Sequence, residues 1–392
     1  MVELNPNATV LEEEGAFAVS DRVAALAAQG RSIINLGIGQ PDFQPPAHVL
    51  EAAERAGRDG PHGYTSPVGM PILREAVVDH VSERLGIKAD AGEVIVVPGG
   101  KVTIFFACAL FGGPGTEILY PDPGFPPYRE AARFTGAKAV GYPIREENDF
   151  AFDAEEVLSL ITPATRLIIL NSPANPTGGV VPKAELDKLA EGLFRHPHVA
   201  VLSDEIYSQQ IYDGGPASLM QVEELRNRVV LLDGWSKTFA MTGWRLGYGV
   251  WPAHLIDHVR KLITINHSCV NGVAQTTALA AITGPWEPID AYRETFRARR
   301  EVVVERLNAL PGVTCRTPGG AFYAFPNISG TRWASRELAS RLLEEAGVAL
   351  MHGESFGENG AGYLRVSYAA STDEINVAMD RFEEFLANAS PA

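Results

Sequence analysis

The sequence has no excess of positive charge. It carries 33 Lys and Arg against 48 Asp and Glu, a formal net charge of -15 over 392 residues, and it contains no polybasic run. Nucleic acids and anionic membrane surfaces are bound through clusters of basic side chains, so this balance argues against both kinds of partner. We therefore expect small-molecule ligands, with neither nucleic acid nor membrane as a partner.

Long apolar runs and frequent cysteines are also missing. No apolar run approaches the roughly 20 residues that span a bilayer, and residues 1–6 lack the basic start and apolar stretch of a signal peptide. The three cysteines, Cys108, Cys269 and Cys315, match no metal-site spacing. Because free thiols suit a reducing compartment, we expect a cytoplasmic protein without a metal.

Short apolar segments alternate along the chain with longer segments of helical period. The short segments lie at 94–97, 118–120, 139–142, 167–170, 199–202 and 229–232. Nearly every residue in them is apolar, which indicates strands buried on both faces, as in a mostly parallel sheet flanked by helices. The sequence therefore predicts an α/β fold, and we place its large domain at residues 49–285.

The pattern changes after residue 285. Apolar residues repeat at helical spacing from Tyr292 to Leu307, and Ser371 with Glu374 forms a capping box ahead of a final amphipathic helix. Residues 1–48 contain a loop rich in glycine and proline and a further helix. We predict a smaller α+β domain from residues 1–48 and 286–392, with an active-site segment near the N-terminus.

Lys237 is the residue with the clearest chemical role. It follows an apolar strand and precedes Arg245 by eight residues. A lysine attacks a carbonyl only as the neutral amine, so it needs a pocket that lowers its pKa. A nearby guanidinium can lower that pKa and also bind a phosphate. With the hydroxyl of Ser236, these groups indicate pyridoxal 5'-phosphate, which carries an aldehyde and a phosphate.

Polar residues and glycines also follow other predicted strands. Asp204 and Tyr207 follow one strand, Asn175 follows another, and Gly100 with Lys101 follows a third. The carboxyl ends of parallel strands are where α/β sheets bind ligands. A carboxylate there can keep a pyridine nitrogen protonated, and backbone amides at a helix start can hold a phosphate. Taken singly, each pattern is also ordinary turn or cap chemistry.

Together and in this order, the motifs resemble those of the class I/II aminotransferases, the fold-type I pyridoxal-phosphate enzymes of the aspartate aminotransferase superfamily. Besides the residues above, the resemblance rests on residues 36–43, 64–69, 175–178, 203–207 and 364–367. It covers nearly all of the chain. It implies the family's large domain, a mostly parallel sheet flanked by helices, and a smaller domain.

The resemblance implies a role for each residue that matches a cofactor-binding position. Lys237 forms the covalent Schiff-base link to the aldehyde and moves a proton at the substrate α-carbon. Asp204 pairs with the ring nitrogen, while Tyr207 and Asn175 bond the phenolic oxygen. The remaining cofactor-binding residues are Phe125 on the ring, and the Gly100 and Lys101 backbone amides with Ser236 and Arg245 at the phosphate. Tyr64 reaches the phosphate of the other subunit, which implies a homodimer with shared active sites.

Substrate binding follows from the same resemblance. Arg365 binds the α-carboxylate as a bidentate pair, helped by the backbone of Gly39 and by Asn175. One dicarboxylate-specific branch of the family carries an arginine in the loop that contains His267, and this chain has none there. Lys101 can take its place, as in another branch of aspartate aminotransferases, which favours an aspartate- or glutamate-type donor. His267 is a second specificity candidate, although a lone histidine is more often structural.

The function expected from these residues is transfer of an amino group between an L-amino acid and a 2-oxo acid. Two alternatives stay open. The same scaffold supports amino-acid lyases and cyclases similar to aminocyclopropane-carboxylate synthase, because the shared intermediate can lose a leaving group instead. A non-catalytic sensor that binds pyridoxal phosphate would carry a basic DNA-binding module, for which this acidic chain has no room.

Overall fold

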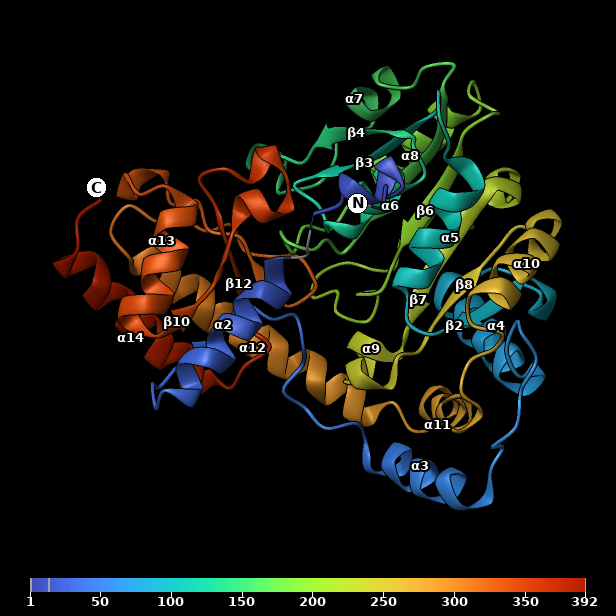
Figure 1. Cartoon of the computed structure of the whole chain (residues 1–392), viewed down its shortest axis with the longest axis horizontal. Coiled ribbons are helices and arrows are strands. Elements are labelled where there is room, and N and C mark those ends of the chain that lie inside the picture. Colours follow the sequence, from blue (N-terminus) through green and yellow to red (C-terminus); the bar gives the residue numbers. More distant parts are fainter. Residues whose placement is uncertain (1, 13–14, 392) are drawn as a thin grey trace.

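The structure is a computed structural model that describes residues 2–12 and 15–391. At its centre lies a seven-stranded sheet with the order β2-β8-β7-β6-β5-β3-β4 (Figure 1). Its strands are β2 (Val94–Val97), β3 (Glu117–Asp122), β4 (Lys138–Pro143), β5 (Thr165–Asn171), β6 (Ala200–Asp204), β7 (Val229–Gly234) and β8 (Gly247–Val250). Neighbours pair in parallel, except that β8 is antiparallel to β2 and β7. The predicted mostly parallel sheet is confirmed.

Helices cover both faces of this sheet, which explains why its strands are so apolar. In β2, Val94 and Val96 pack into one core cluster, whereas Ile95 and Val97 pack into another. The first cluster includes residues of α3 (Ala47–Asp59), α4 (Pro71–Leu85), α7 (Ala154–Ser159), α8 (Lys183–Leu193) and α11 (Gly272–Thr283). The second includes residues of α5 (Lys101–Phe111), α6 (Pro127–Phe134) and α10 (Ile256–Asn266).

A smaller group of elements lies beside the large sheet, at the left of Figure 1. It holds an antiparallel sheet of order β11-β12-β9, with β9 (Tyr323–Ala324), β11 (Met351–His352) and β12 (Leu364–Ser367). Its helices are α2 (Gly15–Ala28), α12 (Glu287–Ala309), α13 (Ser335–Arg341) and α14 (Thr372–Asn388). Residues near the start of the chain join this group, because β1 (Ile34–Asn35) pairs with β10 (Val348–Ala349). The domain boundaries given above stay a prediction.

The strands predicted for the large sheet agree with the structure, but its seventh strand, β8, was not predicted. All six apolar segments lie in or overlap strands, and the Ser371–Glu374 capping box begins α14. β8 was missed because two of its four residues are glycines. A Cβ at Gly247 would lie 2.6 Å from the Gly100 nitrogen, and one at Gly249 would lie 2.3 Å from Trp251 Nε1. Close packing therefore requires glycine where the pattern for a strand requires apolar side chains.

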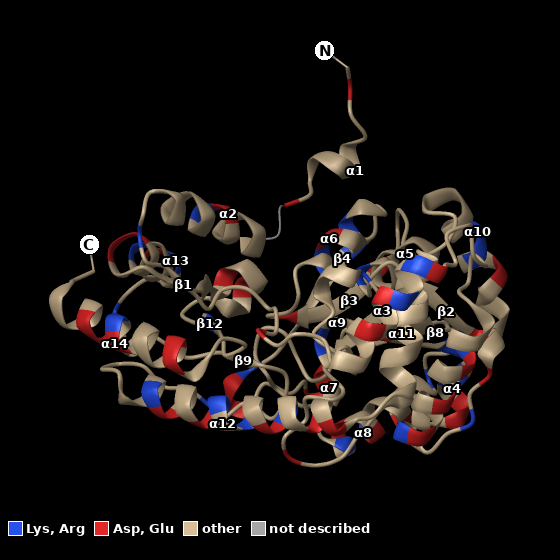
Figure 2. Ribbon diagram, turned by 90° about the horizontal axis from the view of Figure 1, so that it is seen from below, with Lys and Arg blue, Asp and Glu red and all other residues tan. Residues whose placement is uncertain are grey.

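The charged residues of both signs are interspersed along the outer helices. Figure 2 shows both basic and acidic positions along α12. Over the described part of the chain, no helix combines the length and apolarity needed to cross a membrane. The short helix α1 (Pro6–Thr9) has no buried residue and projects from the body of the molecule in Figure 2.

Candidate active site

A cavity of about 500 Å³ lies at the carboxyl ends of β5, β6 and β7. Strand ends contribute Asn171 and Asp204, and segments from the smaller group contribute Tyr323 and Arg365. Every site residue predicted from the sequence lines this cavity except Tyr64 and His267. The fold thus brings together residues that are far apart in the sequence.

Asp204 is the last residue of β6 and is 4% exposed. Its Oδ2 accepts a hydrogen bond of 2.8 Å from the hydroxyl of Tyr128, and its Oδ1 accepts one of 3.2 Å from the amide of Ile206. Burial raises the pKa of Asp204 to about 7, against the lowering effect of these hydrogen bonds. Neither partner carries a positive charge, so the carboxylate suits a cationic group such as a protonated ring nitrogen.

Lys237 lies in α9 (Trp235–Thr238), directly after β7. Its Nζ donates a hydrogen bond to the carbonyl oxygen of Gly39 and lies 5.9 Å from the centre of the Tyr207 ring. Gly39 has no room for a side chain, because a Cβ there would lie 2.0 Å from the hydroxyl of Tyr323. The amine is therefore held between the N-terminal segment and the strand ends.

Groups that suit an anion lie in the same cavity. Gly100 caps the N-terminus of α5, and Ser236 and Arg245 line the cavity with it. The Arg245 backbone is left-handed, with φ of 54°, and its guanidinium donates to the carbonyl of Thr242 at 2.9 Å. A Cβ at Gly99 would lie 2.2 Å from that guanidinium. This combination of helix N-terminus, hydroxyl and guanidinium fits a phosphate.

Arg365 is a buried cation of the cavity wall, with 3% of the residue exposed. It donates 2.8 Å to the side-chain oxygen of Asn175 and 2.5 Å to the carbonyl of Gly37. The guanidinium also lies 4.6 Å from the Tyr323 ring and 4.7 Å from the Phe356 ring. Its Nε is buried and has no hydrogen-bond partner among the described residues. A carboxylate ligand would suit this guanidinium.

Three residues of the site had no role in the sequence prediction. Tyr128 donates to Asp204, and Tyr323 shares a hydrogen bond of 2.8 Å with Tyr207. The Asn171 amide donates to the Asp204 carbonyl at 3.1 Å, and its oxygen accepts from the Asn175 nitrogen at 2.9 Å. Asn171 could have been found from its position at a strand end. The tyrosines are separated from their partners by 76 and 116 residues, and no sequence signal joins them.

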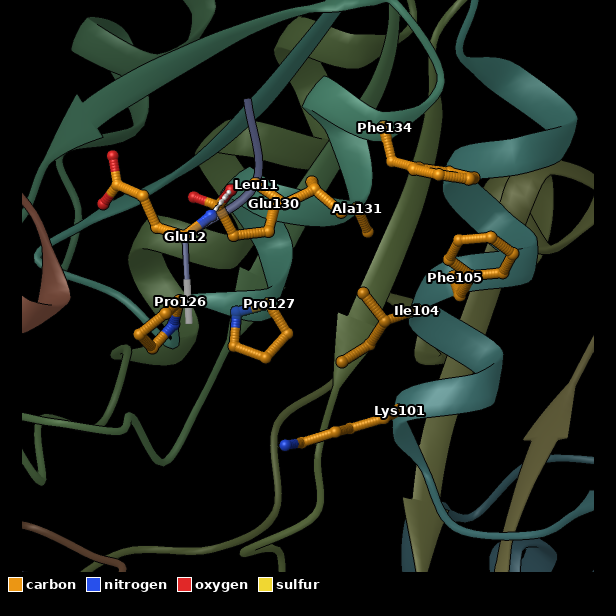
Figure 3. A pocket seen from close by; sticks show the side chains of 10 residues that line it. All are labelled: Leu11, Glu12, Lys101, Ile104, Phe105, Pro126, Pro127, Glu130, Ala131 and Phe134. Carbon is orange, nitrogen blue, oxygen red and sulfur yellow. Dashed lines mark hydrogen bonds between the residues drawn. The ribbon is translucent and has the colours of Figure 1, made fainter. Parts of the chain in front are cut away.

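Lys101 lies where the cavity meets a second one. Its Nζ is 5.1 Å from the Phe125 ring and 5.4 Å from the Phe17 ring. The second cavity, of about 350 Å³, shares Lys101 and Ile104 with the first. Figure 3 shows its other walls, which are mostly apolar: Leu11, Glu12, Phe105, Pro126, Pro127, Glu130, Ala131 and Phe134.

Tyr64 and His267 lie away from the cavity in this chain. Tyr64 is 93% exposed. His267 stacks on Phe106 with ring centres 6.1 Å apart, its Nδ1 bonds the side chain of Asn266, and burial lowers its pKa. Their proposed roles stay predictions that depend on a second subunit. No cluster suited to a metal ion occurs in residues 2–12 and 15–391.

Known proteins are similar to this chain in sequence and in fold. The model of the class I and II aminotransferases matches residues 31–382. An aspartate aminotransferase of Pyrococcus horikoshii is 38% identical over 362 residues, 92% of each chain. An aromatic-amino-acid aminotransferase of Thermococcus litoralis is 36% identical over 364 residues, 92% of this chain and 93% of the relative. The crystal structure of the Rhizobium meliloti aspartate aminotransferase has a TM-score of 0.94 at 32% identity, covering 100% of both chains.

Proposed function

The chain belongs to the class I and II aminotransferases, and on this premise we propose that its amino donor is aspartate or glutamate. It is a pyridoxal-phosphate-dependent transaminase that moves an amino group between an L-amino acid and a 2-oxo acid. The lyase, cyclase and sensor alternatives are not favoured, because the relatives compared above are named aminotransferases.

The observation that carries the proposed donor is a pair of cations that line the same cavity. Arg365 and Lys101 both line the cavity, and they come from different parts of the fold, β12 and the start of α5. An acidic amino acid has two carboxylates, so one cation can bind the α-carboxylate while the other binds the distal one. The aspartate aminotransferases among the relatives support this choice.

The cavity also provides groups for each part of the cofactor. When bound, pyridoxal phosphate supplies an aldehyde that bonds amines and a ring that takes up electrons. The residues that we assign to holding it are Asp204 at the ring nitrogen, Tyr207 and Asn175 at the phenolic oxygen, Phe125 at the ring face, and the Gly100 and Lys101 backbone amides with Ser236 and Arg245 at the phosphate. The buried carboxyl group of Asp204, whose hydrogen-bond partners are neutral, and the anion-binding groups at Gly100 and Arg245 support this assignment.

The chain's own side chains then act on the substrate. We assign Lys237 to removing the proton at the α-carbon and returning it, since its amine lies in the cavity beside Gly39 and Tyr207. Arg365 orients the substrate, because its guanidinium is fixed by Asn175 and Gly37 before any ligand arrives. Arg365 is buried and Lys237 is half-buried, which limits the access of water to both side chains and strengthens their electrostatic interactions.

A donor panel tests the proposed substrate. The purified holoenzyme is mixed separately with aspartate, glutamate, alanine, phenylalanine and lysine, and the cofactor absorbance is followed in single turnovers. We expect aspartate and glutamate to react fastest, and the original spectrum to return when a 2-oxo acid is added. A faster reaction with phenylalanine or lysine would contradict an acidic donor, while the reversible change itself would still demonstrate transamination.

An aromatic donor is the second candidate, and the aromatic rings near Lys101 favour it. The rings of Phe17 and Phe125 lie near the Lys101 amine, and Lys101 also lines the second, mostly apolar cavity (Figure 3). The Thermococcus litoralis relative is named for aromatic amino acids. In the donor panel, phenylalanine at a rate within about tenfold of aspartate would indicate a site that accepts both classes, because tenfold equals only about 1.4 kcal/mol.

We also propose a homodimer with shared active sites. Tyr64 and Ile265 are 93% and 81% exposed, although large apolar side chains are usually covered. The projecting N-terminal helix α1 has no buried residue either. These surfaces support an interface at which Tyr64 of the partner subunit completes the phosphate site. A cytoplasmic location is supported by the three cysteines, all of which are free thiols; cell fractionation would test it.

A mixed-dimer experiment tests the shared site. Lys237→Ala removes the amine from its own subunit's site, whereas Tyr64→Ala affects the site of the other subunit. In a hybrid of the two variants, one site loses both groups and the other keeps both. We therefore expect mixing to restore up to about half of the wild-type activity per hybrid dimer. No gain on mixing, with hybrids demonstrated by differently tagged subunits, would contradict the shared site.

A further inference from the structure

A buried charge cluster adjoins Asp204. Glu205 follows it in the chain, and Asp233 lies on the neighbouring strand β7. One cation reaches both carboxylates: the Arg84 guanidinium, from the last turn of α4, lies 2.9 Å from Glu205 Oε2 and 3.9 Å from Asp233 Oδ2. The side chains of Arg84, Glu205 and Asp233 are 8%, 5% and 4% exposed. The proposed mechanism uses none of the three.

Hydroxyl groups and a backbone amide fix the two carboxylates. Glu205 accepts hydrogen bonds from Ser203 at 2.9 Å and Ser218 at 2.5 Å. Asp233 accepts one from the Ser208 hydroxyl at 2.8 Å and one from the Gly234 amide at 2.7 Å. Glu205 is therefore tied to the end of β6 beside Asp204, and Asp233 to the turn that leads into Lys237.

We propose that Arg84 is a positioning residue for the cofactor site. By binding Glu205 and Asp233, it holds the two strand ends that carry Asp204 and Lys237, and it offsets negative charge that would otherwise favour protonation of Asp204. The inference rests on the proposed role of Asp204 opposite the cofactor's ring nitrogen. It goes beyond that role because Arg84 touches neither the cavity nor Asp204 directly.

The charges around Asp204 agree with this role. Burial is the main cause of its raised pKa, and the negative charges of Asp233 and Glu205 raise the pKa further. Burial lowers the pKa of Arg84, but Glu205 and Asp233 outweigh that effect and raise it above the usual value, so Arg84 stays charged. Other titratable groups around the cluster are Tyr128 from α6, Tyr207 after β6, Lys237 from α9, Tyr248 from β8 and His80 from α4. Burial and the Arg84 charge lower the pKa of His80 to about 4. Burial raises the pKa of the three tyrosines well above 10, which keeps them neutral.

The first test measures cofactor affinity without the covalent step. The full-length chain, stripped of cofactor, is titrated with 4-deoxypyridoxine 5'-phosphate between pH 5.5 and 8; this probe lacks the aldehyde, so it cannot bond Lys237. In Arg84→Met we expect the acidic midpoint of affinity to rise by about one pH unit. Affinity at pH 6 then falls about tenfold, and affinity at pH 8 changes by less than about twofold. Arg84→Lys keeps the charge and should keep the wild-type midpoint within about 0.3 unit.

A second variant should shift the acidic midpoint in the opposite direction, and this test does not depend on whether Arg84→Met folds. Asp233→Asn removes one negative charge and leaves Arg84 in place, so the midpoint should move to lower pH. Arg74→Met is the matched control, because Arg74 lies on the same helix and donates to the backbone carbonyls of Val94, at 2.9 Å, and Ala91. We expect the control to lower the melting temperature and leave the midpoint unchanged.

The outcomes separate this inference from the role on which it rests. An unchanged midpoint in both Arg84→Met and Asp233→Asn, or a shift of the same sign in both, would overturn the role of Arg84. Asp204→Asn tests the underlying assignment: it should weaken probe binding and remove the acidic midpoint. If Asp204→Asn changes neither the probe affinity nor its acidic midpoint, the role of Asp204 is wrong. If Asp204→Asn changes both quantities while the Arg84 variants behave as wild type, only the inference about Arg84 is wrong.

Discussion

The floor and the rim of the cavity are built differently. The floor, which we define as Asn175, Asp204, Tyr207 and Arg365, is between 3% and 6% exposed, and each member has a fixed hydrogen-bond partner. The rim, defined as Phe17, Lys101 and Arg245, is exposed, and Lys101 has two aromatic rings near its amine. Buried groups are oriented before a ligand arrives, whereas exposed side chains can reorient around it. We therefore expect the chemistry to depend on the floor, and the choice of substrate to depend on Lys101 and Phe17 at the rim.

The largest effect is expected from the lysine beside the floor. Lys237→Ala removes both the nucleophile and the general base, so turnover should fall by at least about 10⁴-fold for every donor. Cofactor binding should persist, because Asp204 and the phosphate-binding groups remain. Steady-state rates and the cofactor absorbance of the purified variant measure both properties. The matched control is Lys261→Ala, at an exposed position of α10, for which we expect unchanged turnover. Turnover of Lys237→Ala within tenfold of wild type would refute the role of Lys237 as nucleophile and base.

Asp204→Asn probes the floor itself. Turnover should fall by about 10²- to 10³-fold with every donor, because a neutral amide stabilises a cationic ring nitrogen poorly. Asparagine keeps the shape and can still accept the hydrogen bond from Tyr128. Donor-independent loss is the feature that distinguishes floor from rim, and the panel of donors measures it. A loss of turnover confined to one donor class would contradict the division of roles between the floor and the rim.

Asp204 also predicts a pH dependence of stability. Burial raises its pKa from 3.8 to about 7, so between about pH 4 and pH 7 the folded chain binds a proton more readily than the unfolded chain. Its contribution to the stability of the cofactor-free chain therefore falls as pH rises through this window. Asp204→Asn removes that penalty, so we expect a higher melting temperature than wild type at pH 8 and little difference at pH 4. Equal differences at both pH values would contradict the raised pKa.

Most of the floor was predictable from sequence, because Asn175, Asp204 and Tyr207 lie at or just after strand ends and Arg365 belongs to a motif of a known family. Asp204, Asn175 and Lys237 each come after an apolar segment, and parallel strands bring those ends to one edge of the sheet. The supporting residues were not predictable. Tyr128 and Arg84 contact partners more than 70 residues away, and neither belongs to a motif that marks the contact.

The rim was harder to predict for a physical reason. Lys101 was identified as a specificity candidate through the resemblance alone, and Phe17 was not identified at all. The position of Phe17 depends on how α2 packs beside the cavity, which no local pattern in residues 15–28 specifies. Tyr64 and His267 lie outside the cavity of this chain, so their roles need contacts between subunits. The substrate class consequently stays a proposal.

Lys101→Met tests whether the rim selects the donor. Methionine keeps much of the side-chain length but removes the charge that we assign to the distal carboxylate. We expect kcat/KM for aspartate to fall about 10- to 100-fold, because a hydrogen bond to a charged group contributes about 1.5–3 kcal/mol. For phenylalanine the change should stay within about threefold, since phenylalanine offers no distal charge. Equal losses for both donors would assign Lys101 to the cofactor and not to the substrate.

Phe17→Ala should give the smallest effect. Phe17 is 56% exposed, so its removal should change the free energy of unfolding by less than about 0.5 kcal/mol. Its ring lies 5.4 Å from the Lys101 amine, and an exposed cation–π contact contributes about 0.5–1 kcal/mol. Without this contact Lys101 is less restrained, so kcat/KM for aspartate should change by only about two- to fivefold. For phenylalanine we expect a loss at least as large, because the apolar wall shrinks. Thermal unfolding and the kcat/KM values for aspartate and phenylalanine measure these effects. A loss of kcat/KM above about 100-fold with both donors would show that Phe17 contributes to the chemistry as the floor residues do, despite its exposure.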